Sequence, residues 1–154
     1  MIISASPAAA VSFAERVLEE RGVLLTLAKV RGLLVGRVTE AEIEDRAKDV
    51  LLGAVEKRLK ANQTVVLTLE SLDASEREAY VRLAHASRRP RHLILLETPR
   101  EQVPEEHRTA LNELRRALDA GELGSEGFQT ALRLGGNTQG ELKRVVFQPP
   151  ARED

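Results

Sequence analysis

The chain has 154 residues, of which 42% are hydrophobic and 31% charged, and its formal net charge at pH 7 is −1. A chain of this length buries about 68–70% of its unfolded surface, which is enough for a core without covalent or metal staples. The absence of cysteine excludes disulfides, thiolate catalysis and cysteine-ligated metals, and the balanced charge gives no overall field for nucleic acid or an anionic membrane. Because the sequence has neither a long apolar run nor a basic leader segment, we expect a cytoplasmic protein without a membrane segment.

The first half of the sequence alternates short apolar runs with helical patterns. Residues 1–5 predict a strand, and Ser6 followed by Pro7 is typical of a helix start. The unbroken apolar run 23–27 predicts a strand covered on both faces. Thr39 and Glu42 have the spacing of a capping box, which predicts that a long helix opens there and continues to about residue 61.

The second half continues the alternation. Residues 64–69 and 93–96 predict two further buried strands, and Ser75 with Glu78 predicts a capped helix between them. Pro104 starts a helical pattern that ends before Gly121. The remaining expectations are a short helix over 125–134, a glycine-rich loop over 134–140 and a last strand over 143–147. Parallel strands need helical crossovers, so five alternating strands predict an α/β fold of three layers. We expect one domain over residues 1–148 and a flexible tail over 149–154.

The first strand-to-helix turn is where a phosphate-binding loop would lie. Such a loop has the spacing Gly, four residues, then Gly-Lys-Ser/Thr, and its backbone N–H groups surround the phosphates. Here Ala5 and Ala10 stand at the glycine positions, Val11 at the lysine position, and only Ser12 fits. Alanine favours helix over any other structure. The sequence therefore predicts that the helix starts near Pro7 and closes the anion slot.

The order and lengths of the elements over residues 1–100 resemble those of P-loop kinases of the polynucleotide 5′-kinase and zeta-toxin type. The resemblance rests on the strand 24–27 followed by Lys29 and Arg31, on the long helix ending in Arg58-Leu59, and on the strand 64–69 followed by Arg77. It implies a P-loop-NTPase-like fold with a parallel five-stranded sheet in the order 2-3-1-4-5. In that comparison the phosphate-binding lysine falls on Val11, the general-base aspartate on Ala28 and the aspartate of the third strand on Thr68.

The resemblance also implies which residues keep a role. Arg31 and Arg77 are the candidate anion contacts that remain, together with Ser12 of the degenerate loop. Glu70 lies two residues beyond Thr68 on the same strand face, so it is a candidate for a displaced catalytic carboxylate. Both arginines are also compatible with ordinary surface ion pairs.

The densest basic stretch is 85–92, in which Arg88, Arg89 and Arg91 are a candidate nucleic-acid patch. It has no interleaved aromatic residue, so it also fits a charged loop before the fourth strand. The three histidines have no metal-ligand spacing, and we expect no metal and no cofactor.

Phosphoryl transfer depends on positioning and electrostatics, and Val11 and Ala28 supply neither. The sequence therefore predicts a catalytically inactive domain that acts as a binding or structural module, with a protein partner or self-association favoured over nucleic acid. Two alternatives stay open: an active nucleotide or polynucleotide 5′-kinase that uses Mg·ATP with non-standard residues, and an oligomerisation scaffold without a ligand.

Overall fold

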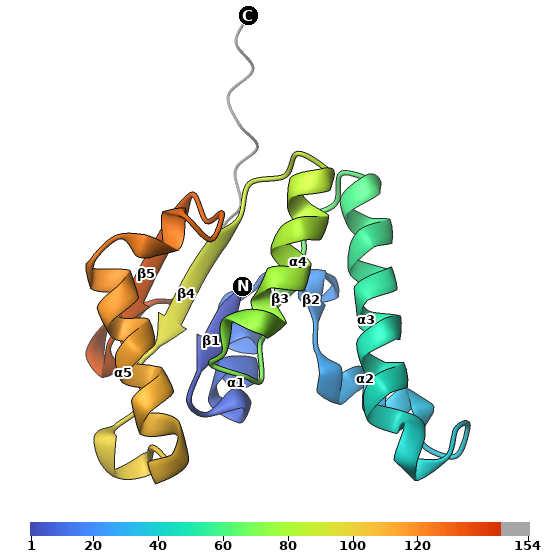
Figure 1. Cartoon of the computed structure of the whole chain (residues 1–154), viewed down its shortest axis with the longest axis horizontal. Helices are drawn as coiled ribbons and strands as arrows, with labels where there is room; N and C mark the ends of the chain where they lie inside the picture. The colour runs from blue at the N-terminus through green and yellow to red at the C-terminus, as the bar shows by residue number, and fades with distance from the viewer. Residues whose placement is uncertain (146–154) are drawn as a thin grey trace, which may run out of the picture.

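Helices flank a set of short parallel strands in the computed structural model, which describes residues 1–145 except for the side chains of residues 137 and 138 (Figure 1). The strands are β1 (Ile2–Ser4), β2 (Leu24–Leu25), β3 (Val66–Leu67), β4 (His92–Leu96) and β5 (Thr130–Leu134). The helices are α1 (Pro7–Val17), α2 (Leu27–Leu34), α3 (Ile43–Lys60), α4 (Ala74–Ala86), α5 (Glu105–Asp119) and α6 (Gly136–Glu141). Short 3₁₀ turns lie at Arg21–Val23, Glu40–Glu42, Arg100–Gln102 and Glu122–Gly124.

The strands form two separate parallel sheets. One has the order β1-β4-β5, with Ile2 opposite Ile94, and the other pairs β2 with β3, with Leu24 opposite Val66. Between β1 and the chain after β3 there is a single parallel bridge, from Ile2 to Thr68, and the N–H of Leu69 donates to the carbonyl of Ile2 at 2.8 Å. The expected parallel five-stranded sheet was therefore wrong, although the α/β class was right.

The sheet is divided because two of the expected strands are shortened. In the run 23–27, the hydroxyl of Thr26 accepts a hydrogen bond from the N–H of Lys29 at 3.1 Å and so caps α2, which begins at Leu27. Only Leu24 and Leu25 remain extended and paired. Of the expected strand 64–69, only Val66 and Leu67 form a ladder.

The expected helix over 125–134 was also wrong, because residues 125–127 form a turn and residues 130–134 form strand β5. Gly127 has a φ of +107°, which a helix does not allow. The N–H of Gln129 donates to the carbonyl of Arg91 at 2.8 Å and fixes the register in which β5 adds to the edge of β4. The expected strand 143–147 is reduced, within the part of the chain that the structure describes, to one bridge between Val145 and Leu18. Phe147 and the expected tail 149–154 lie outside the described residues.

Helices α1, α3, α4 and α5 occur where the sequence predicts them, whereas α2 begins inside the expected strand 23–27 and α6 lies in the segment 134–140, so the expected loop there was wrong. Two of the predicted caps also differ. Thr39 makes no side-chain cap, and a 3₁₀ turn separates it from α3. Helix α4 begins at Ala74 rather than at Ser75. The carboxylate of Glu76 accepts from the N–H groups of Glu70 and Ser71, at 3.1 and 2.6 Å, and so fixes the loop before the helix.

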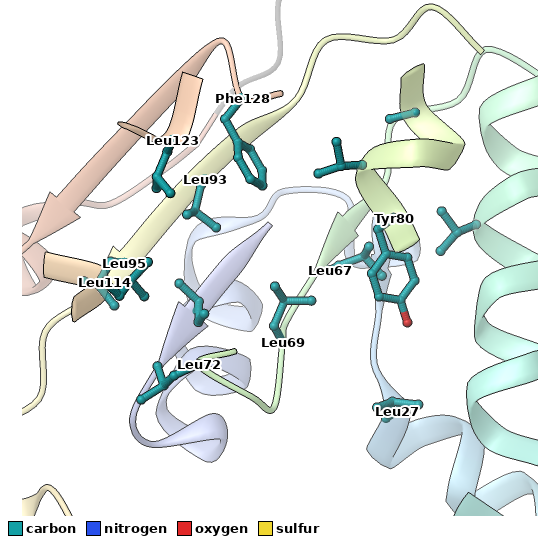
Figure 2. Packing of buried hydrophobic residues seen from close by; sticks show 14 of the residues in the cluster. Leu27, Leu67, Leu69, Leu72, Tyr80, Leu93, Leu95, Leu114, Leu123 and Phe128 are labelled. Atoms are coloured by element: carbon teal, nitrogen blue, oxygen red, sulfur yellow. The ribbon is translucent and has the colours of Figure 1, made fainter. Parts of the chain in front are cut away.

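Two apolar clusters lie on opposite faces of the strands. Along β1 the side chains alternate, so that Ile2 joins the cluster under α1 and Ile3 joins the larger cluster under α3, α4 and α5. Figure 2 shows the larger cluster, in which Leu93, Leu123 and Phe128 lie close together on one side and Tyr80 points toward Leu27 on the other. The clusters hold the helices so that the carboxyl ends of α3 and α4 lie at the same end of the molecule (Figure 1).

Candidate functional site

The first strand-to-helix turn is closed by helix α1, as the sequence predicts. Ser6 is the N-cap residue, and its hydroxyl accepts from the N–H of Ala9 at 3.4 Å. The carbonyl of Ser6 accepts from Ala9 and Ala10 at 3.0 and 3.2 Å. The N–H of Ser6 donates to the hydroxyl of Ser4, which is hydrogen-bonded to Thr98. These bonds satisfy the N–H groups of Ser6, Ala9 and Ala10, which a phosphate loop would present to an anion.

The four degenerate loop positions do not surround a common space. Ala5 and Ala10 are buried, and Ala10 packs beside Phe13 in the cluster under α1. Val11 is half-buried, and the side chain of Ser12 is exposed on the opposite face of the helix. The structure thus places Ala5 before the N-cap of α1, and Ala10, Val11 and Ser12 on different faces of that helix, rather than gathering the four residues around a ligand.

Arg31 is held by two carboxylates. Its Nε lies 2.5 Å from Oε1 of Glu44, and its Nη1 donates to Oε2 of Glu70 at 2.8 Å. The hydrogen bonds that Arg31 donates, first to Glu70 and then to Glu44, raise its pKa above the usual value. The pKa of the Glu44 carboxyl is lowered, chiefly by its hydrogen bond to Arg31. Arg31 is therefore not free for a ligand anion, and Glu70 is not a free catalytic carboxylate.

Arg77 is buried, with 6% of its surface exposed. It donates to the carbonyl of Leu72 at 3.1 Å and to the carboxylate of Glu126 at 2.9 Å. The sequence contains a signal for this burial, because Arg77 stands three, four and seven residues before Tyr80, Val81 and Ala84, which form the apolar stripe of α4. Its role in the structure is to join α4 to the segment before β5.

The three arginines of the basic stretch lie at a large cavity. Its volume is about 800 Å³, and it opens at the amino ends of β1, β3 and β4, where the two sheets share only the Ile2–Thr68 bridge. Its apolar wall comes from both faces of the strands and includes Ile2, Phe13, Val17, Val55, Leu59, Val66 and Ile94. Asn62, Gln63, Thr64, Ser87, Arg88, Arg89, Arg91 and His92 also line it. We call these eight residues the cavity rim.

The charged side chains of the cavity rim are all basic. None of the described residues that line the cavity is acidic, although the chain contains 24 acidic residues. Within residues 1–145, Arg88, Arg89 and Arg91 form no ion pair with a carboxylate, whereas Arg31 and Arg77 do. Arg91 donates to the carbonyls of Gly127 and Arg89, at 2.6 and 3.0 Å, so it fixes the rim loop. Of the three rim arginines, Arg88 and Arg89 are the two whose guanidinium groups have no hydrogen-bond or ion-pair partner within residues 1–145.

Two residues of the cavity rim have left-handed backbone. Asn62, with φ +58°, and Arg88, with φ +54°, are the non-glycine residues of positive φ in the part of the chain described. Each follows the last turn of a helix, and the next N–H donates back into that helix, from Gln63 to Arg58 at 2.9 Å and from Arg89 to Ala84 at 2.8 Å. This is the Schellman arrangement, in which glycine is the usual residue. The sequence did not indicate Asn62, Gln63 and Thr64 as site residues, because the residue pattern of a turn between a helix and a strand does not show that the turn lines a cavity.

A smaller cavity of about 320 Å³ lies beside α5 and is lined by Arg100, Arg108 and Arg115 among others. Arg115 is held there by Glu97, with its Nε 3.0 Å from Oε1. Burial opposes ionisation of Glu97, but hydrogen bonds and charge from Arg115 and Arg133 outweigh it and lower the pKa of this carboxyl.

No protein-family model matches the sequence, and no match was found among curated proteins. The kinase resemblance therefore stays a prediction from spacing. Among the described helices none is long and apolar enough to cross a membrane, and no group of three His, Asp or Glu residues within residues 1–145 is arranged to hold a metal ion.

Proposed function

We propose that this protein is a non-catalytic binding module. The observation that carries the proposal is the closed turn at Ser6. There the backbone N–H groups that would bind phosphate in a phosphate loop are hydrogen-bonded within the start of α1. Arg31 and Arg77 are neutralised by carboxylates, so they add no electrostatic stabilisation for a transferring phosphoryl group. A kinase that uses Glu70 would first have to break the Arg31–Glu70 ion pair.

The binding site in this proposal is the cavity between the sheets. Ligand sites are concave, largely apolar volumes of about 300–1,000 Å³ with a few polar groups that orient the ligand. The cavity of about 800 Å³ and its rim have these properties, and they lie at the end of the strands opposite to the closed turn. Cytoplasmic location remains an expectation from the sequence.

A second candidate function is self-association through the edge of the larger sheet. Strand β5 forms that edge, and the side chain of Leu132 on it is 53% exposed. An unpaired edge strand with an exposed apolar residue is a template for pairing with another chain. Sedimentation of the protein and of a Leu132→Lys variant distinguishes this function: a dimer that the variant abolishes supports the scaffold, and a monomer in both excludes it.

The test of the proposed function is thermal unfolding and turnover with Mg·ATP. A tight ligand stabilises the native state by about 2.7 kcal/mol at a hundred times its Kd. We expect no shift of the melting temperature and no phosphate release or 5′-phosphorylation of an oligonucleotide. Turnover that a Glu70→Ala variant abolishes would contradict the proposal and favour a kinase with a displaced carboxylate.

A further inference from the structure

We propose that the cavity takes a small amphiphilic anion, with an apolar body inside the cavity and a carboxylate or phosphate head bound by Arg88 and Arg89. This inference rests on the proposed function, because it takes the cavity as the binding site. It adds the chemical class of the ligand and the two side chains that recognise it.

The interior selects for an apolar body. Phe13 and Val17 come from α1 on one face, Val55 and Leu59 come from α3 on the other, and Ile94 comes from β4. Such a wall offers no hydrogen-bond partner to a fully polar molecule, whose desolvation would be uncompensated. A free phosphate or a sugar phosphate therefore lacks the part that the cavity recognises.

The rim selects for a negative head. Guanidinium groups bind carboxylates and phosphates with paired, charge-assisted hydrogen bonds, and Arg88 and Arg89 have no carboxylate partner among the described residues. The carboxyl ends of α3 and α4 both meet this rim and bring partial negative charge to it. The backbone therefore repels an anion here, so the attraction depends on the two arginines.

The backbone at Arg88 is an independent indication that this side chain has a role outside folding. A left-handed C′ position is most easily filled by glycine, and an L side chain there is strained. The side chain of Arg88 is exposed and makes no hydrogen bond within residues 1–145 that would compensate for this conformation. An arginine at this position offers a charge to the cavity mouth, which glycine would not.

Single-stranded nucleic acid fits this site less well. Such strands are bound by grooves that combine positive charge with aromatic side chains on which bases stack. The rim holds no Phe, Tyr or Trp, and Phe13 and Tyr80 are both buried.

The experiment is isothermal titration calorimetry of the full chain with submicellar dodecanoate and dodecyl phosphate. Three comparison probes are dodecyltrimethylammonium, which has the same body with a cationic head, inorganic phosphate, which has no body, and a single-stranded oligonucleotide. We expect saturable binding of one molecule of either anionic amphiphile per chain, and at least tenfold weaker binding of the three comparison probes.

The decisive variant is Arg88→Gly combined with Arg89→Ala. Because glycine suits the backbone of position 88, we expect the variant to keep the melting temperature of the parent and to bind dodecanoate at least tenfold more weakly, as loss of a charge-assisted hydrogen bond requires. The matched control is Arg82→Ala with Arg116→Ala, which removes the same charge from two exposed residues paired with Glu78 and Glu122. The control should bind as the parent does.

Several outcomes would overturn the inference. These are equal binding of the cationic amphiphile, equal weakening by the control variant, absence of any amphiphile binding, or displacement of dodecanoate by the oligonucleotide. Absence of amphiphile binding together with absence of Mg·ATP turnover rejects the inference but leaves the protein non-catalytic. Mg·ATP turnover rejects the proposed function itself, whatever the amphiphiles do.

Discussion

Arg77 and Glu126 are 49 positions apart in the chain, and the guanidinium of Arg77 donates to the carboxylate of Glu126 through both Nη2, at 2.9 Å, and Nε, at 3.2 Å. The pair joins the first half of α4 to the segment that precedes β5. Since Arg77 is buried and Glu126 is about one-third exposed, the pair is only partly in contact with water. Arg77 is thereby committed to the fold, which is why the proposed ligand site does not include it.

The first prediction concerns this ion pair. Glu126→Ala leaves the Arg77 guanidinium buried without its carboxylate, and we expect a loss of about 2 kcal/mol in the free energy of unfolding, below the 3–5 kcal/mol of a fully buried pair. Urea denaturation measures this loss. The control is Glu122→Ala, which removes the exposed partner of Arg116 and should cost less than about 1 kcal/mol. Equal effects of the two variants would mean that the Arg77–Glu126 pair is no more than a surface contact.

The second prediction concerns Gly127. A Cβ atom at this position would lie 2.9 Å from Cγ1 of Val81, and the φ of +107° is one that other residues avoid. We expect Gly127→Ala to destabilise the protein by at least about 1 kcal/mol. By contrast Gly53, within α3, has open space for a Cβ, so Gly53→Ala should stabilise by about 0.5–1 kcal/mol. The same sign for both variants would contradict the local geometry.

The third prediction concerns Tyr80, the single tyrosine of a chain without tryptophan. Burial, with smaller contributions from the charges of Glu76 and Glu70, raises the pKa of Tyr80 to about 12. Its hydroxyl group should therefore ionise near pH 12 in the native protein and near pH 10 in concentrated urea. Absorbance at the phenolate band measures both titrations.

The raised pKa of Tyr80 also sets a pH dependence of stability. The unfolded chain loses the tyrosine proton first, so the contribution of neutral Tyr80 is complete below pH 10 and is lost as the pH rises from 10 to about 12. A Tyr80→Phe variant lacks the ionisable group and should lose less stability over that interval. A native titration near pH 10 would show that the hydroxyl group is in water.

The fourth prediction concerns Glu97, which is hydrogen-bonded to Arg115 and Arg133. Its pKa is lowered in the folded protein, so its contribution to stability is present above its unfolded pKa of about 4.5 and is lost as the pH falls below that value. We expect Glu97→Gln to be less stable than the parent at pH 7, with a smaller difference near pH 3. A difference that does not change with pH would mean that Glu97 acts through packing rather than charge.

The sequence predicted the local start of α1 and missed the division of the sheet. Ser6, Pro7 and the alanines act within one turn of helix, so their propensities decide the outcome. The apolar run 23–27 is compatible with a full strand and with a shorter strand that ends in a helix cap. The side chain of Thr26 determines which of the two forms, because it caps α2. Segment 130–134 is a strand because the edge of β4 is available to it, and this long-range pairing leaves little local pattern.

The sequence also predicted only the basic part of the candidate site. The cluster Arg88, Arg89 and Arg91 was visible in the sequence as charge, but its apolar partners Phe13, Val55 and Ile94 are far away along the chain. The spacing of the resembled kinase family suggested Arg31 and Arg77 as anion contacts. Their carboxylate partners Glu70 and Glu126 lie 39 and 49 residues further along the chain. Ion pairing over such separations depends on the fold and cannot be read from neighbours in the sequence.

The proposed ligand site is the cavity between the sheets and not the turn between β1 and α1. A direct test is amide chemical-shift mapping of the ¹⁵N-labelled full chain, titrated separately with dodecanoate and with Mg·ATP. We expect dodecanoate to shift the amides of residues 62–66 and 88–92 in a saturable way, and Mg·ATP to leave the amides of residues 5–12 unchanged. Saturable shifts over residues 5–12 with Mg·ATP, and none at the cavity rim with dodecanoate, would contradict this assignment.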